Sequence, residues 1–84
     1  MNNIPYVDSI IDAYPSEYFI KADGFDDAII GVDENSMCLI YSVTKCIEIL
    51  QNDMDYDDAM EYFYFNMKDA YVGEKTPIWC FDNF

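Results

Sequence analysis

The chain has 84 residues, 52% of them hydrophobic and 18% aromatic, so it is long enough for one small domain and too apolar for a disordered segment. Its 17 acidic residues face only four lysines, with no arginine and no histidine, which gives a formal net charge of −13. This charge excludes conventional binding to nucleic acid or to an anionic membrane surface, and it favours a basic protein as partner.

The first predicted element is a short amphipathic helix that ends before Pro15. The apolar side chains that recur there at helical spacing are Tyr6, Val7, Ile10, Ile11 and Tyr14. Residues 1–14 lack the basic start and long apolar run of a signal peptide, and no apolar run is long enough to cross a bilayer. With three cysteines that form no C-x-x-C pair, these features predict free thiols in a reducing cytoplasm.

A β-hairpin is predicted next. The segment 17–22 is rich in β-formers and fits either a short strand or the lead into a turn at residues 23–24. Two apolar runs, Asp27–Val32 and Met37–Tyr41, then flank four polar residues whose Asp and Asn suit turn positions. Gly31 inside the first run indicates a bulge or a close approach by another element.

Two helices are predicted after the hairpin. Ser42 is a suitable N-cap for a short helix over residues 43–52, whose inward face consists of Val43, Cys46, Ile47 and Leu50. A loop over residues 52–54 joins it to a second helix, so the two should form an αα-hairpin.

The second helix is expected to be long, acidic at its start and aromatic nearly all the way round, within Asp53–Gly73. Asp55 is its predicted N-cap and Gly73 its predicted stop. A core face is predicted from Ala59, Met60, Phe63 and Met67. The rings of Tyr56, Tyr62, Tyr64 and Phe65 cannot all share that face, so some pack against a second layer or wait on the surface for a partner.

A final strand, Ile78–Asp82, follows a turn and Pro77. The predicted fold is therefore a single α+β domain over residues 1–84: ββααβ, with a three-stranded antiparallel sheet packed by the αα-hairpin and a short N-terminal helix before it. Trp79 and Phe81 share one face of the last strand, where they either fill the core or form an exposed hot spot for binding.

Four separated segments carry a resemblance: GFDDAIIG (24–31), LIYSVTKCIEIL (39–50), DAMEYFYFN (58–66) and AYVGEKTPI (70–78). Together they resemble a widespread family of short proteins encoded by tailed phages. The resemblance implies a phage origin, and hence the host cell cytoplasm, and it assigns no catalytic or binding residues. By analogy, small acidic phage proteins of this size often block a host protein, including CRISPR effectors and restriction nucleases.

Neither an enzyme nor a metal protein is predicted. The run Asp53-x-Asp55-x-Asp57 begins like a calcium-binding EF-hand loop, but Asp58 replaces the required glycine and Tyr64 the bidentate glutamate. A catalytic cysteine has no histidine to serve as its base. The cysteines Cys38, Cys46 and Cys80 therefore fit buried apolar positions, and no cofactor is expected.

The acidic surface is the remaining candidate site. It either keeps the protein soluble or mimics the phosphates of DNA toward a basic host protein, which would make the chain an anti-CRISPR or anti-restriction inhibitor. The alternative is a self-associating accessory protein with an aromatic homodimer interface. The predicted partner-binding residues are Asp23, Asp26, Asp27, Asp33, Glu34, Asp55, Tyr56, Asp57, Asp58, Glu61, Tyr62 and Phe65.

Overall fold

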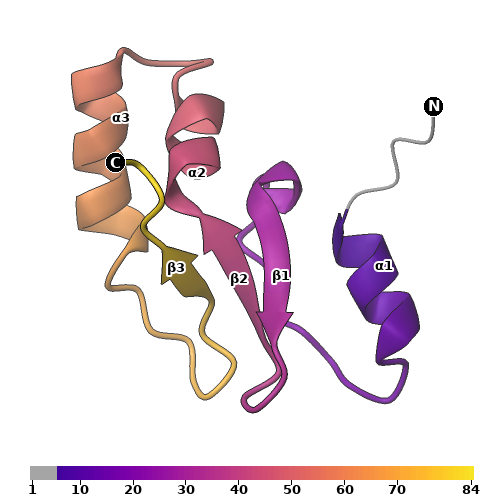
Figure 1. The fold of residues 1–84 in the computed structure, drawn as a ribbon. Helices are drawn as coiled ribbons and strands as arrows, with labels where there is room; N and C mark the ends of the chain where they lie inside the picture. The colour runs from indigo at the N-terminus through magenta and orange to yellow at the C-terminus, as the bar shows by residue number, and fades with distance from the viewer. Residues whose placement is uncertain (1–5) are drawn as a thin grey trace, which may run out of the picture.

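The computed structural model describes residues 6–84, without the side chain of Tyr6, as helices arranged around a three-stranded sheet (Figure 1). In chain order the elements are α1 (Tyr6–Ala13), the 3₁₀ turn η1 (Asp26–Ala28), β1 (Ile29–Asp33), β2 (Cys38–Ser42), α2 (Val43–Leu50), α3 (Tyr56–Tyr62), the π-helical turn η2 (Phe63–Met67) and β3 (Ile78–Cys80). The predicted α+β class, its three strands and its paired helices are confirmed.

The hairpin of β1 and β2 contains the predicted bulge. Ile29 pairs with Tyr41 and Gly31 with Ile40, so Ile30 is an extra residue without a partner in β2. A Cβ added at Gly31 would meet no atom of the described residues within 4 Å, so the close approach that was the other explanation for this glycine is not observed among them.

The third strand pairs differently from the prediction. β3 lies beside β2 and runs parallel to it, with Ile40 opposite Ile78, so the sheet is mixed and the expected fully antiparallel sheet is wrong. The physical reason is the connection: α2 continues directly from β2, and α3 then returns the chain to the starting end of the sheet. Such a helical crossover is what parallel neighbours require.

The long helix ends earlier than expected. α3 and η2 stop at Met67, and Gly73, at φ 107°, begins a separate turn in which the Thr76 N–H donates to the Gly73 carbonyl at 3.2 Å. The segment between Met67 and Ile78 continues to the end of the sheet at which β3 starts and reverses the chain direction there, so the helix does not continue to residue 73 (Figure 1).

Ser42 is the N-cap of α2, as predicted, and the Asp82 carboxylate takes part in the same cap. The Ser42 hydroxyl accepts from the Lys45 N–H at 3.1 Å and donates to the Asp82 carboxylate at 2.6 Å. Asp82 also accepts from the Thr44 N–H at 3.0 Å, and these bonds lower the pKa of its carboxyl group. Because Asp82 caps α2 in this way, β3 ends at Cys80, two residues short of the predicted strand end.

One face of the sheet carries the core. Leu39 and Tyr41 point into it, whereas Ile40 on the opposite face is half-buried. The predicted inner faces of α2 and of α3 with η2 are buried, except that Met60 is half-buried. In α1, Val7 and Ile10 are buried; the prediction for the Tyr6 side chain lies outside the described residues.

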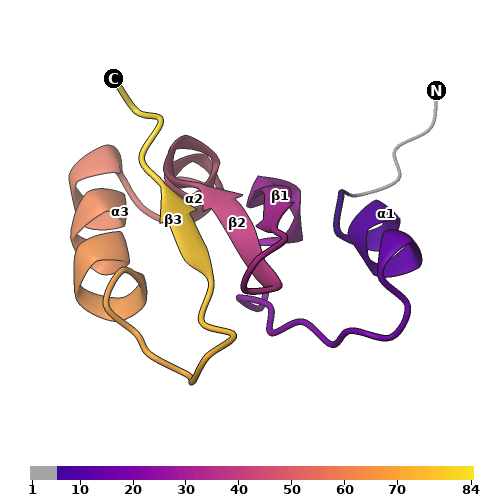
Figure 2. The ribbon, with the colours of Figure 1, turned by 60° about the horizontal axis from the view of Figure 1, so that its bottom comes forward.

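The segment 14–25 closes the core without forming the alternative strand over residues 17–22. Phe19, Ala22 and Phe25 pack against the core, and the Ala22 N–H donates to the buried Tyr41 hydroxyl at 2.7 Å. Burial raises the pKa of that phenol. In both ribbon views α1 lies beyond β1 and α3 beyond β3, so helices flank the two edges of the sheet (Figures 1 and 2).

Candidate protein-interaction surface

Helix α3 begins at an acidic cap. The Asp55 carboxylate accepts from the Asp58 N–H at 2.8 Å, as predicted, and Asp57 and Asp58 occupy the first turn, where the helix dipole stabilises negative charge. Ala59 and Phe63 face the core and are fully buried. Their burial fixes the rotation of the helix and therefore decides which side chains remain outside.

The outer side of α3 and η2 carries a mixed stripe. Asp58 lies three residues before Glu61 and four before Tyr62, and Phe65 lies four and three residues after them, which is the spacing of a single helical face. The exposed fractions are 42% for Tyr62 and 81% for Phe65. We call Asp57 and these four residues the acidic–aromatic face. All five side chains are exposed, so the rings of Tyr62 and Phe65 lie on the surface and not against a second layer.

The π turn η2 separates neighbouring rings. The Lys68 N–H donates to the Phe63 carbonyl at 2.9 Å, which closes a turn one residue wider than an α-helical turn. π turns of this kind occur frequently at functional sites. Phe63 is buried. The ring of Tyr64 lies on a different side of the turn and packs at a tilt against Phe81, with ring centroids 6.3 Å apart. The turn η2 therefore has two exposed aromatic areas. Phe65 forms one of them and Tyr64 the other.

Trp79 is half-buried and packs against the core. Its ring centroid lies 5.3 Å from that of Tyr41 and 5.3 Å from that of Phe63, so it joins the sheet to η2. The core interpretation is therefore correct for Trp79. Phe81 is only half covered, at 37% exposed.

Four of the predicted partner-binding acids form ion pairs or hydrogen bonds with other residues of the chain. Asp26 pairs with Lys21 at 3.2 Å, and Asp55 is the cap of α3. Asp33 accepts from the Ser36 hydroxyl at 2.7 Å in the hairpin turn. Glu34 accepts from the Tyr14 hydroxyl at 2.6 Å, a bond that raises the pKa of this tyrosine. These carboxylates have local structural roles.

The other five predicted acids are free within residues 6–84. Asp23, Asp27, Asp57, Asp58 and Glu61 are exposed, and their carboxylates form no ion pair or hydrogen bond with described residues. Asp27 lines a shallow hollow together with Glu48, which sequence reasoning did not select. Glu48 stands among apolar residues on α2, and only the placement of α2 against η1 brings it near Asp27.

The acids do not form one continuous stripe. The hollow beside α2 places Asp27 near Asn52, at the same end of the molecule as the start of α3. Asp33 and Glu34 lie at the opposite end of β1, which is five residues long and thus spans about 17 Å. Tyr56 lines a separate hollow with Gln51 and Met60, away from the acidic–aromatic face.

The thiols and carboxylates form no reactive cluster in the described chain. Cys38 and Cys46 are buried, Cys80 is half-buried rather than buried, and all three are free. Burial raises the pKa of the Cys46 thiol to about 12, so it is not a nucleophile at neutral pH. Residues 6–84 contain no group of three or more Cys, Asp or Glu side chains placed to hold a metal ion.

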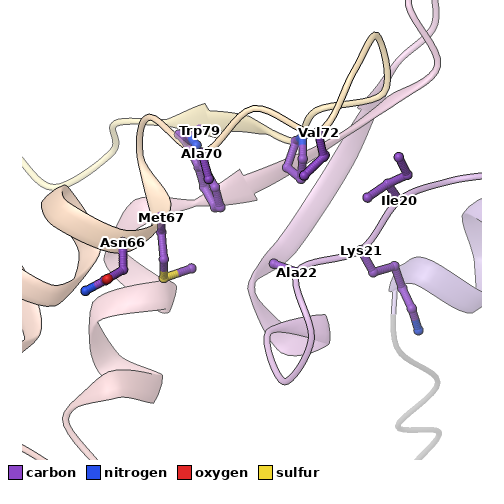
Figure 3. A pocket seen from close by; sticks show the side chains of 9 residues that line it. Ile20, Lys21, Ala22, Asn66, Met67, Ala70, Val72 and Trp79 are labelled. Carbon is purple, nitrogen blue, oxygen red and sulfur yellow. The ribbon is translucent and has the colours of Figure 1, made fainter.

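A further cavity of about 160 Å³ has a mostly apolar lining (Figure 3). Its wall comes from three segments far apart in sequence, which include Ala22, Met67 and Trp79, so no local pattern could predict it. It has room for a small apolar group and offers few polar atoms to orient one.

In comparisons with known proteins, no protein-family model, no curated protein and no solved structure matches this chain. In the part of the chain that the structure describes, no helix is both long and apolar enough to span a bilayer.

Proposed function

We propose that this protein is a non-catalytic, phage-encoded inhibitor that binds a basic host protein in the host cytoplasm. Its target would be a nucleic-acid-handling or defence protein of the anti-CRISPR or anti-restriction type, and the acidic surface would occupy the groove meant for DNA or RNA. The observation that carries the proposal is the acidic–aromatic face of α3 and η2, where Asp57, Asp58 and Glu61 pair with no other side chain of residues 6–84 and lie beside the exposed rings of Tyr62 and Phe65.

Charge and exposed rings supply different parts of such binding. Unpaired carboxylates steer a basic surface toward the protein and are weakened by salt. Exposed aromatic side chains supply apolar area and are enriched among the residues that dominate binding energies. Three of the four lysines are already paired with acids, so they do not cancel the negative charge of this face.

The proposed binding surface is smaller than the set of residues predicted from the sequence. We assign binding to Asp57, Asp58, Glu61, Tyr62 and Phe65, and not to Asp33, Glu34 or Asp55, whose carboxylates are engaged in turns and caps. Asp27 and Glu48 line a second hollow at the same end of the molecule, where Lys45 offsets part of their negative charge.

The test is affinity capture from host lysate with the tagged protein, at low and high salt and with competing DNA. The variant D57N/D58N/E61Q removes three charges from the acidic–aromatic face and leaves the Asp55 cap intact. Its control is D8N/D12N/E74Q, which changes the net charge equally at exposed positions elsewhere. The proposal predicts a nucleic-acid-binding protein that DNA displaces and that only the first variant fails to capture. Equal capture by both variants, or capture that DNA does not affect, contradicts it.

A self-associating accessory protein is the second candidate, and the Tyr64–Phe81 pair is the observation that favours it. Two copies would bury these rings against each other, but each copy carries a net charge of −13. Such a dimer should therefore persist or strengthen as salt is added, whereas capture through charge weakens. Light scattering of the pure protein measures this, with Y64S/F81S as the disrupting variant and Y18S/Y71S, at separate exposed rings, as control.

A further inference from the structure

The acidic–aromatic face contains a groove with a defined chemistry. A hollow of about 280 Å³ is lined by Met54, Asp58, Glu61, Tyr62, Phe65 and Asn66. It combines two carboxylates, two aromatic rings, a thioether and an amide. All of these side chains are exposed except Met54, which is half-buried, so the groove is open to a partner.

We propose that this groove receives an arginine side chain of a basic protein, and this inference rests on the function proposed above. A guanidinium group is flat, always charged and weakly hydrated, and it stacks on aromatic faces while donating a forked pair of hydrogen bonds to a carboxylate. The groove offers both partners together: Tyr62 and Phe65 supply rings, and Asp58 and Glu61 supply acceptors.

The negative charge of the groove disfavours ligands other than arginine. An anion would be repelled by Asp58, Glu61 and the net charge of −13. An apolar group would have to desolvate two carboxylates that find no compensating donor within the described chain. A lysine ammonium matches the charge but is strongly hydrated and cannot stack as a plane, so it should bind more weakly than arginine.

The geometry of η2 supports the same assignment. Phe63 and Met67 are buried on the inner side, which anchors the turn, while Phe65 projects outward at 81% exposed. A ring held out from an anchored turn is preorganised for stacking and loses little conformational freedom on binding. Phe65 forms no aromatic pair with any other described ring, unlike its neighbour Tyr64.

The probe is acetyl-arginine methylamide, titrated into the ¹⁵N-labelled protein at low salt and followed by NMR. The expected result is saturable shifts of backbone amides over residues 54–66, with acetyl-lysine methylamide binding more weakly. F65A and E61Q should each weaken binding about two- to fivefold, the range expected for one exposed ring or one exposed carboxylate. The controls Y71A and E74Q remove an exposed ring and a carboxylate outside the groove and should leave the affinity within twofold.

Three results would overturn the inference. They are shifts spread over all acidic segments without saturation, lysine binding at least as tightly as arginine, and F65A binding like Y71A. The outcome is separable from that of the proposed function: a failed titration with intact, DNA-sensitive capture removes only the groove. A specific titration without any captured nucleic-acid-binding protein retains the groove and removes the inhibitor.

Discussion

Two phenylalanines two positions apart in the sequence should differ strongly in their response to the same substitution. Phe63 is fully buried and Phe65 is 81% exposed, although both belong to the π turn η2. The replacement Phe63→Leu keeps most of the apolar volume but removes three edge-to-face contacts, with Trp79 at 5.3 Å, Tyr64 at 5.6 Å and Phe81 at 6.1 Å. Each such ring pair is worth about 0.5–1.5 kcal/mol beyond area burial. The expected loss in the free energy of unfolding is therefore about 2 kcal/mol.

Urea denaturation followed by far-ultraviolet circular dichroism measures this loss. With a slope of about 1 kcal/mol per molar urea, typical of a small protein, the midpoint should fall by about 2 M. Phe65→Leu is the matched control and should stay within about 0.5 kcal/mol of the unmodified protein, as exposed substitutions do. Phe63→Ala is a poorer choice, because its cost of about 3–5 kcal/mol approaches the whole stability of a domain of this size. Equal losses for the two leucine variants would refute the assignment of inner and outer rings in η2.

The remaining predictions concern pH, thiols and salt. The Asp82 cap should stabilise the protein fully above the ordinary carboxyl pKa of 3.8, and this contribution should vanish as the pH falls through the lowered pKa of the folded protein. The Asp82→Asn variant should therefore be less stable than the unmodified protein at pH 6 and closer to it in acid, as measured by thermal melts. Because the folded pKa of Cys46 is about 12 and the ordinary thiol value is 9.0, the contribution of the buried Cys46 thiol to stability should be fully present below pH 9.0 and be lost as the pH rises toward 12, as thermal melts measure. In a native alkylation experiment read by mass spectrometry, Cys80 should react before Cys46, and labelling of Cys46 first would contradict its burial. Added NaCl should raise the melting temperature, since it screens the repulsion within a chain of net charge −13; a lower melting temperature would argue against that repulsion.

Local signals in the sequence predict the elements well. Ser42 and Asp55 are correct as N-caps because a cap depends on one side chain and the backbone two or three residues later. The bulge at Gly31 and the inner face of α2 are correct for the same reason. Each of these features is decided by residues within one or two turns of chain.

Features that depend on distant segments are not accessible in this way. The direction of β3 depends on how the helical crossover returns to the sheet, and Ile78–Cys80 carries the same pattern in either direction. The end of η2 is set by the path back to β3 and not by a local stop residue. Similarly, the acids that cap turns cannot be told from free acids by composition, because Glu34 is engaged only when Tyr14 of another element reaches it.

The parallel pairing of β2 with β3 sets an order for folding. β1 and β2 are joined by a short turn and can pair with little loss of loop entropy, whereas β3 pairs with β2 only across the whole length of α2, α3 and η2. Trp79 lies in β3 and meets Tyr41 and Phe63 only when that closure is complete. Fluorescence of this single tryptophan, in a stopped-flow refolding experiment, should therefore follow the last step of folding, later than the signal of the hairpin and the helices.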